Sequence, residues 1–126
     1  MDKTFYITTP IYYPSAKPHM GHAYSSIIAD FFARFKIIDD YQVHFLTGTD
    51  EHGLKIQRSA EKAGKEPQIF CDQISQTFRD LSDTLNLSNT DFIRTTEARH
   101  KKTVQHLWNE LEKNDDIYLS NYSGWY

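Results

Sequence analysis

The sequence predicts an α/β fold in which a doubly wound parallel sheet carries helices on both faces. Runs of β-branched and aromatic residues alternate along the chain with segments of helical periodicity. Such alternation favours parallel strands joined by right-handed helical crossovers. With 126 residues, 39% of them hydrophobic and 25% charged, the chain can bury one sizeable core and has a globular composition.

Three segments have the character of buried strands. Residues 4–9 end at Pro10, and residues 42–47 end at Gly48. A weaker third run covers residues 91–95. β-branched and aromatic side chains suit pleated backbone, and proline or glycine ends such a run. We therefore expect these segments to form the sheet.

The longest helical pattern begins at Met20. Pro18 suits its first turn, because the N–H that proline lacks would have no intrahelical partner there. Apolar residues then recur with helical spacing, which predicts one wide apolar stripe on a helix of about five turns. The stripe consists of Ala23, Tyr24, Ile27, Ile28, Phe31, Phe35 and Ile38.

Three further helices are expected along the chain. Asp50 or Thr49 caps the first, which ends before Gly64. Pro67 opens the second, and Thr96 caps the third. The apolar stripe of the second is Phe70, Ile74, Phe78, Leu81 and Leu85, and the third is expected to bury Val104, Leu107, Trp108 and Leu111.

The charge, the cysteine content and the N-terminus exclude several classes of protein. The net charge of −3 and the pI near 6.0 argue against a stand-alone nucleic-acid-binding module, which is normally basic. The single cysteine, Cys71, excludes an internal disulfide and fits a reducing compartment. The N-terminus lacks an apolar signal core, and no apolar run approaches the ~18 residues of a membrane span. We expect a cytoplasmic chain with no membrane segment.

The strongest chemical signal is the pentapeptide Pro18-His19-Met20-Gly21-His22, at the start of the long helix. Free N–H groups and the positive dipole end of a helix bind anions there. His19 and His22 are three residues apart and share one helical face. Gly21 has no Cβ, so a flat ring or a phosphate chain can approach the backbone. These features predict a site for a nucleoside triphosphate.

The string His19-Met20-Gly21-His22 resembles the HIGH signature of class I aminoacyl-tRNA synthetases. Three surrounding segments resemble the methionyl members of that family: residues 5–13 (FYITTPIYY), 45–53 (FLTGTDEHG) and 91–97 (DFIRTTE). Nucleotidylyltransferases share the HxGH string, so the resemblance depends on all of these segments occurring in order along the whole chain.

The resemblance implies a ligase that activates methionine to methionyl-adenylate with ATP and Mg²⁺, then transfers it to tRNA(Met) in protein synthesis. His19 and His22 would be catalytic and hold the ATP phosphates, while Gly21 would admit the adenine. Asp50 would accept the ammonium group of methionine. The implied methionine-binding residues are Ile11, Tyr13 and Asp50, with Pro10 and His52 as further candidates.

The resemblance also implies a domain organisation. Residues 1–116 would be the N-terminal part of a Rossmann-like nucleotide-binding catalytic domain, and residues 117–126 the start of an inserted domain. A Lys-Met-Ser-Lys-Ser-like loop and an anticodon-binding domain do not occur in the sequence. We therefore expect the chain alone to be inactive, with most tRNA contacts outside it. Cys71 by itself gives no support for a zinc site.

Other interpretations of the same residues stay open. His19, His22, Asp50 and His52 are residue types that suit a zinc-like ion, so a metal-dependent hydrolase is one alternative. A non-catalytic nucleotide-binding module is another. Asp50 has a plainer interpretation as a helix cap, Tyr13 as a core aromatic residue, and His52 as part of the second helix.

Overall fold

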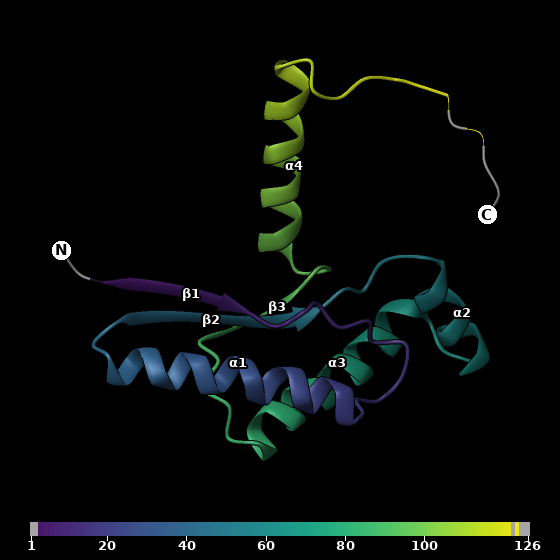
Figure 1. Ribbon diagram of the computed structural model, residues 1–126. Helices are drawn as coiled ribbons and strands as arrows, with labels where there is room; N and C mark the ends of the chain where they lie inside the picture. Colours follow the sequence, from purple (N-terminus) through teal and green to yellow (C-terminus); the bar gives the residue numbers. More distant parts are fainter. Residues whose placement is uncertain (1–2, 122, 124–126) are drawn as a thin grey trace. The chain divides into compact units, whose positions relative to one another are not determined.

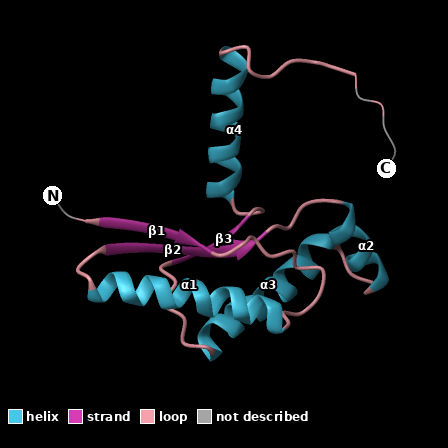
Figure 2. Cartoon of the chain, viewed as in Figure 1, coloured by secondary structure: helices cyan, strands magenta, loops and turns pink. Residues whose placement is uncertain are grey.

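A computed structural model describes residues 3–121 and 123 of the chain (Figure 1; Figure 2). The chain divides into two compact units, one ending at Thr96 and the other beginning at Glu97. The elements in chain order are β1 (Thr4–Thr8), α1 (Met20–Ile38), β2 (Gln42–Thr49), α2 (Leu54–Lys62), α3 (Pro67–Thr84), β3 (Asp91–Arg94) and α4 (Ala98–Lys113).

The three strands form one parallel sheet in the order β1-β2-β3. β1 pairs with the first part of β2, where Thr8 lies opposite Leu46, and β3 pairs with the last part, where Thr49 lies opposite Arg94. The predicted parallel α/β fold, of the Rossmann-like type, is confirmed. β2 continues through Gly48, where the sequence predicted its end.

Gly48 is needed for strand pairing rather than for a turn. A Cβ at this position would lie 2.0 Å from the backbone oxygen of Ile93, the residue opposite it on β3. No side chain fits such a gap, so only glycine allows the two strands to approach this closely. From the sequence, Gly48 was expected to end the strand; its close contact with Ile93 on β3 could not be predicted.

Within the first unit, α1 and α3 lie on the same face of the sheet (Figure 1). Successive right-handed crossovers that add strands in one direction return their helices to one face. The opposite face carries Tyr6, which is 60% exposed and stacks on His44 with ring centroids 5.3 Å apart. The expected helices on both faces are therefore not seen within this unit.

α1 packs on the sheet through small side chains. Ala29 and Ala33 are buried against Phe45, with Ile7 and Val43 beside them. Alanine lets a helix axis lie close to the sheet, so these residues determine the buried face. The large members of the predicted stripe point elsewhere and are 41–83% exposed: Tyr24, Ile27, Ile28, Phe31, Phe35 and Ile38.

α3 buries Phe70 and Phe78 of the predicted stripe, whereas Ile74, Leu81 and Leu85 are half-buried. Phe70 packs with Ile56 and Ala60 of α2, and Phe78 packs with Tyr12 and Phe92. These contacts attach α2 and α3 to the sheet beside the loop that follows β1.

The predicted caps of α2 and α4 are wrong. β2 extends to Thr49, and α2 begins only after Gly53, which makes no side-chain cap bond, so neither Asp50 nor Thr49 caps it. α4 has Glu97 at its N-cap, while the Thr96 hydroxyl donates to the carboxylate of Glu51 instead. The hydroxyls of Thr49 and Thr96 donate to Glu51 instead, and the Asp50 carboxylate lies beside the Thr95 hydroxyl.

The predicted burial on α4 is also wrong. Its apolar residues are 36–57% exposed, because among the described residues of its own unit no other helix or strand packs against them. These residues are Val104, Leu107, Trp108 and Leu111.

The inserted segment that the sequence predicts over residues 117–126 includes residues 122 and 124–126, which lie outside those described. In the part of the chain that the structure describes, no helix is long and apolar enough to cross a membrane.

Candidate active site

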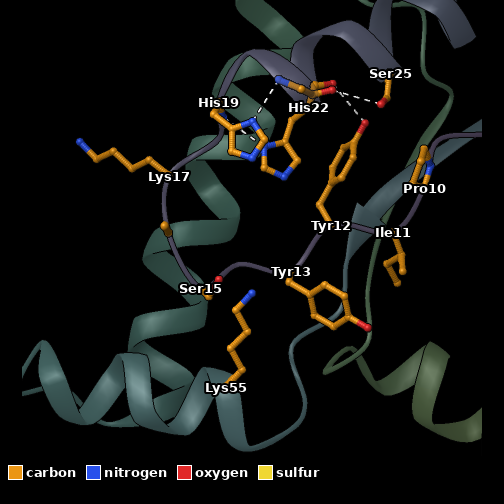
Figure 3. Close-up of a pocket in the computed structure, with 12 residues that line it drawn as sticks. Pro10, Ile11, Tyr12, Tyr13, Ser15, Lys17, His19, His22, Ser25 and Lys55 are labelled. Atoms are coloured by element: carbon orange, nitrogen blue, oxygen red, sulfur yellow. Dashed lines mark hydrogen bonds between the residues drawn. The ribbon is translucent and has the colours of Figure 1, made fainter.

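A cavity of 390 Å³ opens between the loop after β1, the N-terminus of α1 and the start of α2 (Figure 3). Six of the residues that the sequence singled out line it: Pro10, Ile11, Tyr13, His19, Gly21 and His22. The other lining residues are Tyr12, Ser15, Ala16, Lys17, Ser25 and Lys55.

His19 and His22 form a reciprocal cap at the N-terminus of α1. The Nδ1 atom of His19 accepts a hydrogen bond from the backbone N–H of Gly21 at 3.0 Å. The Nδ1 atom of His22 accepts one from the backbone N–H of His19, also at 3.0 Å. The two imidazoles thus replace the hydroxyl and carboxylate of an ordinary capping box. Their ring centroids are 3.9 Å apart.

This cap determines which nitrogens remain available. A backbone N–H can only donate, so both Nδ1 atoms act as acceptors. In a neutral imidazole with an accepting Nδ1, the proton is on Nε2. Each ring therefore offers one Nε2–H donor beyond the cap.

Burial lowers the pKa of His22, and the neighbouring His19 lowers it further. The His22 ring meets Tyr12 and Phe78 edge to face, with centroid distances of 4.9 and 5.1 Å. These aromatic contacts displace water from the ring and hold its plane. His22 is accordingly neutral at pH 7 and acts as a positioned hydrogen-bond donor.

Gly21 makes room for the His19 ring. A Cβ on Gly21 would lie 2.9 Å from Cε1 of His19 and 3.1 Å from its Nδ1. Any larger residue would push the imidazole out of its cap. This intramolecular role exists beside the open approach for a ligand that the sequence suggested.

Tyr12 was not singled out from the sequence, yet it fixes the geometry of the loop. Its backbone N–H donates to Gly48 O at 3.1 Å, and its hydroxyl is 2.9 Å from Ser26 Oγ and 3.3 Å from His22 O. Tyr12 is buried, whereas the adjacent Tyr13 is 52% exposed at the cavity. The interpretation of Tyr13 as a core residue is wrong, because an extended segment turns successive side chains to opposite sides.

Asp50 lies beside this loop, at the end of β2. Its N–H donates to Tyr12 O at 2.8 Å, and its Oδ1 is 3.5 Å from Thr95 Oγ1. His52 lies in a different cavity, of 590 Å³, next to α2, where its Nε2 is 3.3 Å from Thr95 O. His52 is therefore not brought together with His19 and His22.

The ligand set of the hydrolase alternative is not assembled. Among the residues that the structure describes, no three His, Cys, Asp or Glu side chains come together in an arrangement that could hold a metal ion. The four proposed ligands instead occur at separate places, with only the two histidines of α1 at one cavity.

Two lysines at the cavity were also missed by the sequence analysis. Lys17 precedes the helix, and Lys55 is in the first turn of α2, with its Nζ 5.9 Å from the ring centroid of Tyr13. Positive charges beside helix N–H donors suit a polyphosphate. An isolated lysine carries no pattern that separates it from a solvated one, so the fold was needed to find them.

Known proteins resemble this chain over nearly its whole length. The mitochondrial methionine–tRNA ligase of Takifugu rubripes is 54% identical over 99% of this chain and 21% of its own length. Methionine–tRNA ligase 1 of Bacillus cereus is 52% identical over 99% of this chain and 19% of its own length. The chain thus spans about a fifth of the length of these relatives.

The structure of the chain also resembles that of a solved synthetase. Mycobacterium tuberculosis methionyl-tRNA synthetase, in complex with methionyl-adenylate, superposes with a TM-score of 0.95 and 49% identity, over 98% of this chain and 24% of that one. The profile of the family described as tRNA synthetases class I (M) matches residues 5–126. Because that match covers almost the entire chain, the chain belongs to the class I tRNA synthetase family, in its methionyl (M) branch.

Proposed function

We propose that this chain is the N-terminal part of the catalytic domain of a methionine–tRNA ligase. The complete protein would use ATP, entering with Mg²⁺, to convert methionine to methionyl-adenylate and would then transfer the methionyl group to tRNA(Met). The observation that carries this proposal is the His19–His22 cap at the cavity, with its two Nε2–H donors. Whole-chain similarity to methionine–tRNA ligases supports it.

In the first step, a carboxylate oxygen of methionine attacks the α-phosphorus of ATP. The bond from that phosphorus to the bridging oxygen breaks, and pyrophosphate leaves with the electron pair. His19 and His22 donate hydrogen bonds to phosphate oxygens on which negative charge increases, next to the N-terminus of α1. Such preorganised donors, together with alignment of the two substrates, account for most of what this chemistry requires.

The methionine site in this proposal lies along the loop after β1. Ile11 and Tyr13 line the cavity, with Pro10 beside them, and offer apolar and aromatic surface to the side chain. Asp50, whose backbone is bonded to that loop, accepts the ammonium group. His52 faces another cavity, so its part in binding has less support.

The tRNA would bind mostly through parts of the protein outside this chain, and residues 1–126 alone would be inactive. We propose that the protein acts in the cytoplasm, and the likeness to bacterial relatives supports this. One relative is mitochondrial by name, so imaging of a fluorescent fusion would test that placement.

Methionine-dependent exchange of pyrophosphate into ATP by the complete protein tests the proposal. Replacing His22 by alanine removes one donor and should reduce kcat by about 100-fold or more. His106→Ala, an exposed histidine of α4, serves as the matched control and should leave the rate unchanged. A wild-type protein without methionine-dependent exchange would contradict the function, and full activity of His22→Ala would contradict the role of the cap.

A further inference from the structure

The tripeptide Asp50-Glu51-His52 contains a buried carboxylate that the proposed reaction does not use. The side chain of Glu51 is 0% exposed. Its Oε1 accepts hydrogen bonds from Thr49 Oγ1 at 2.8 Å and from Arg94 Nε at 2.7 Å. Its Oε2 accepts from Arg94 Nη2 at 3.0 Å and from Thr96 Oγ1. A buried carboxylate with four donors is fixed in place.

Arg94 balances the charge of Glu51 and connects it to the rest of the fold. Its guanidinium also pairs with Asp72 of α3, at 2.5 Å. Burial acts to raise the pKa of Glu51, but the hydrogen bonds from Arg94, Thr96 and Thr49 outweigh burial and hold the pKa below its ordinary value. The carboxylate is therefore ionised at neutral pH, and the network joins the ends of β2 and β3 to α3.

Thr95 connects this network to Asp50. Its Oγ1 accepts a hydrogen bond from the N–H of Glu51 at 2.8 Å, and it is 3.5 Å from Oδ1 of Asp50. Because the Thr95 oxygen accepts the bond from Glu51, the proton of the Thr95 hydroxyl is free to be donated, and it points to the carboxylate of Asp50. The N–H of Thr95 donates to Thr49 O at 3.1 Å.

The network supplies rigidity where the chain has no regular structure. Residues 50–53 lie between the end of β2 and the start of α2, and the N-cap residue Gly53 makes no side-chain cap bond. A carboxylate on such a segment must be held by tertiary contacts if it is to meet a ligand in one geometry.

We propose that Glu51, Arg94 and Thr95 are positioning residues that fix the carboxylate of Asp50 for the ammonium group of the amino-acid substrate. This inference rests on the proposed function. The Glu51 carboxylate is occupied by Arg94, Thr49 and Thr96, whereas Asp50 is held by Thr95. The network is thus a determinant of amino-acid affinity and has no part in holding ATP.

A pair of variants at Thr95 in the complete protein tests the inference. Thr95→Val keeps the shape but removes the hydroxyl, and should raise the KM for methionine about fivefold, because the Asp50 carboxylate loses its 3.5 Å hydroxyl donor. The KM for ATP should stay within about twofold, because the ATP donors belong to another element. Thr95→Ser retains the hydroxyl and should restore the methionine KM.

A second variant keeps the test decisive if Thr95→Val does not fold. Thr96→Val removes a donor to Glu51 at the edge of the network and should raise the methionine KM in the same direction, by about threefold, without change for ATP. The Kd for methionine, measured by calorimetry, should shift by the same factors.

The outcomes separate the two proposals. A wild-type protein that neither binds methionine nor exchanges pyrophosphate would overturn the proposed function. An active wild-type protein whose Thr95→Val and Thr96→Val variants unfold at lower temperature but keep the wild-type methionine KM would overturn the positioning role alone. Equal rises in the KM for methionine and for ATP would overturn it as well.

Discussion

At the N-terminus of α1, two histidines satisfy backbone N–H groups and still have one nitrogen each for a ligand. This arrangement depends on Nδ1 of both rings, which accept from Gly21 and His19. The tautomer is thus set by main-chain donors that are always present. A phosphate would meet two N–H groups already oriented, so little reorganisation would accompany the reaction.

The tautomers can be measured directly. In the neutral protein, ¹⁵N chemical shifts of labelled imidazoles should show a protonated Nε2 and an unprotonated Nδ1 in both His19 and His22. The exposed His106 should show no such fixed preference. A protonated Nδ1 in either ring of α1 at neutral pH would contradict the cap.

The same spectra should give a midpoint for His22 below its ordinary 6.5, because burial lowers its pKa. The unfolded chain then binds more protons than the folded one between the two midpoints, so stability rises with pH through this window. An elevated His22 midpoint would contradict the half-buried position of the ring beside His19.

At the scale of single elements, the pairing of β2 with β3 depends on Gly48. Gly48→Ala would place a methyl group 2.0 Å from Ile93 O, and the strands must separate to admit it. We expect the free energy of unfolding to fall by about 3 kcal/mol, the upper end of the range for overpacking.

Gly64→Ala is the matched control for this prediction. Gly64 has φ +63, and a methyl group added there would meet no atom within 4 Å, so only backbone strain of about 1 kcal/mol should result. Urea denaturation compares the two variants. Equal losses of stability would show that close strand approach has no special importance at Gly48.

The sequence predicted most of the helices and strands, but not which of their faces are buried. Strand character and helical periodicity depend on neighbouring residues, so β1, β2, α1 and α3 were recognisable. Which face of α1 meets the sheet depends on Ala29 and Ala33, whose small size allows close packing that a hydrophobicity pattern does not measure. The exposure of Trp108 likewise depends on what packs against α4.

The site shows the same limit. His19, Gly21 and His22 share one turn, and their spacing alone brings them together. The partners of Asp50 could not be predicted, because Thr95 is 45 residues away in the sequence. Local capping favoured Asp50 as a helix cap, and the extension of β2 through Thr49 removed that option.

At the scale of the whole molecule, the parallel sheet gathers the carboxyl ends of its strands at one edge, where the candidate site lies. The loop after β1 lines the cavity, the residue after β2 is Asp50, and the segment after β3 supplies the network around Glu51. Ligands of open parallel α/β sheets bind at this edge in general. Three segments distant in the sequence therefore contribute to one proposed site.

The central claim is that the paired imidazoles of α1 hold the phosphate of an activated methionine. A crystal structure of the complete protein with a non-hydrolysable methionyl-adenylate analogue measures this directly. We predict phosphate oxygens within hydrogen-bond distance of Nε2 of His19 or His22, and the ammonium group at Asp50. An analogue bound with its phosphate away from both rings, or rings turned out of the cavity, would contradict the account.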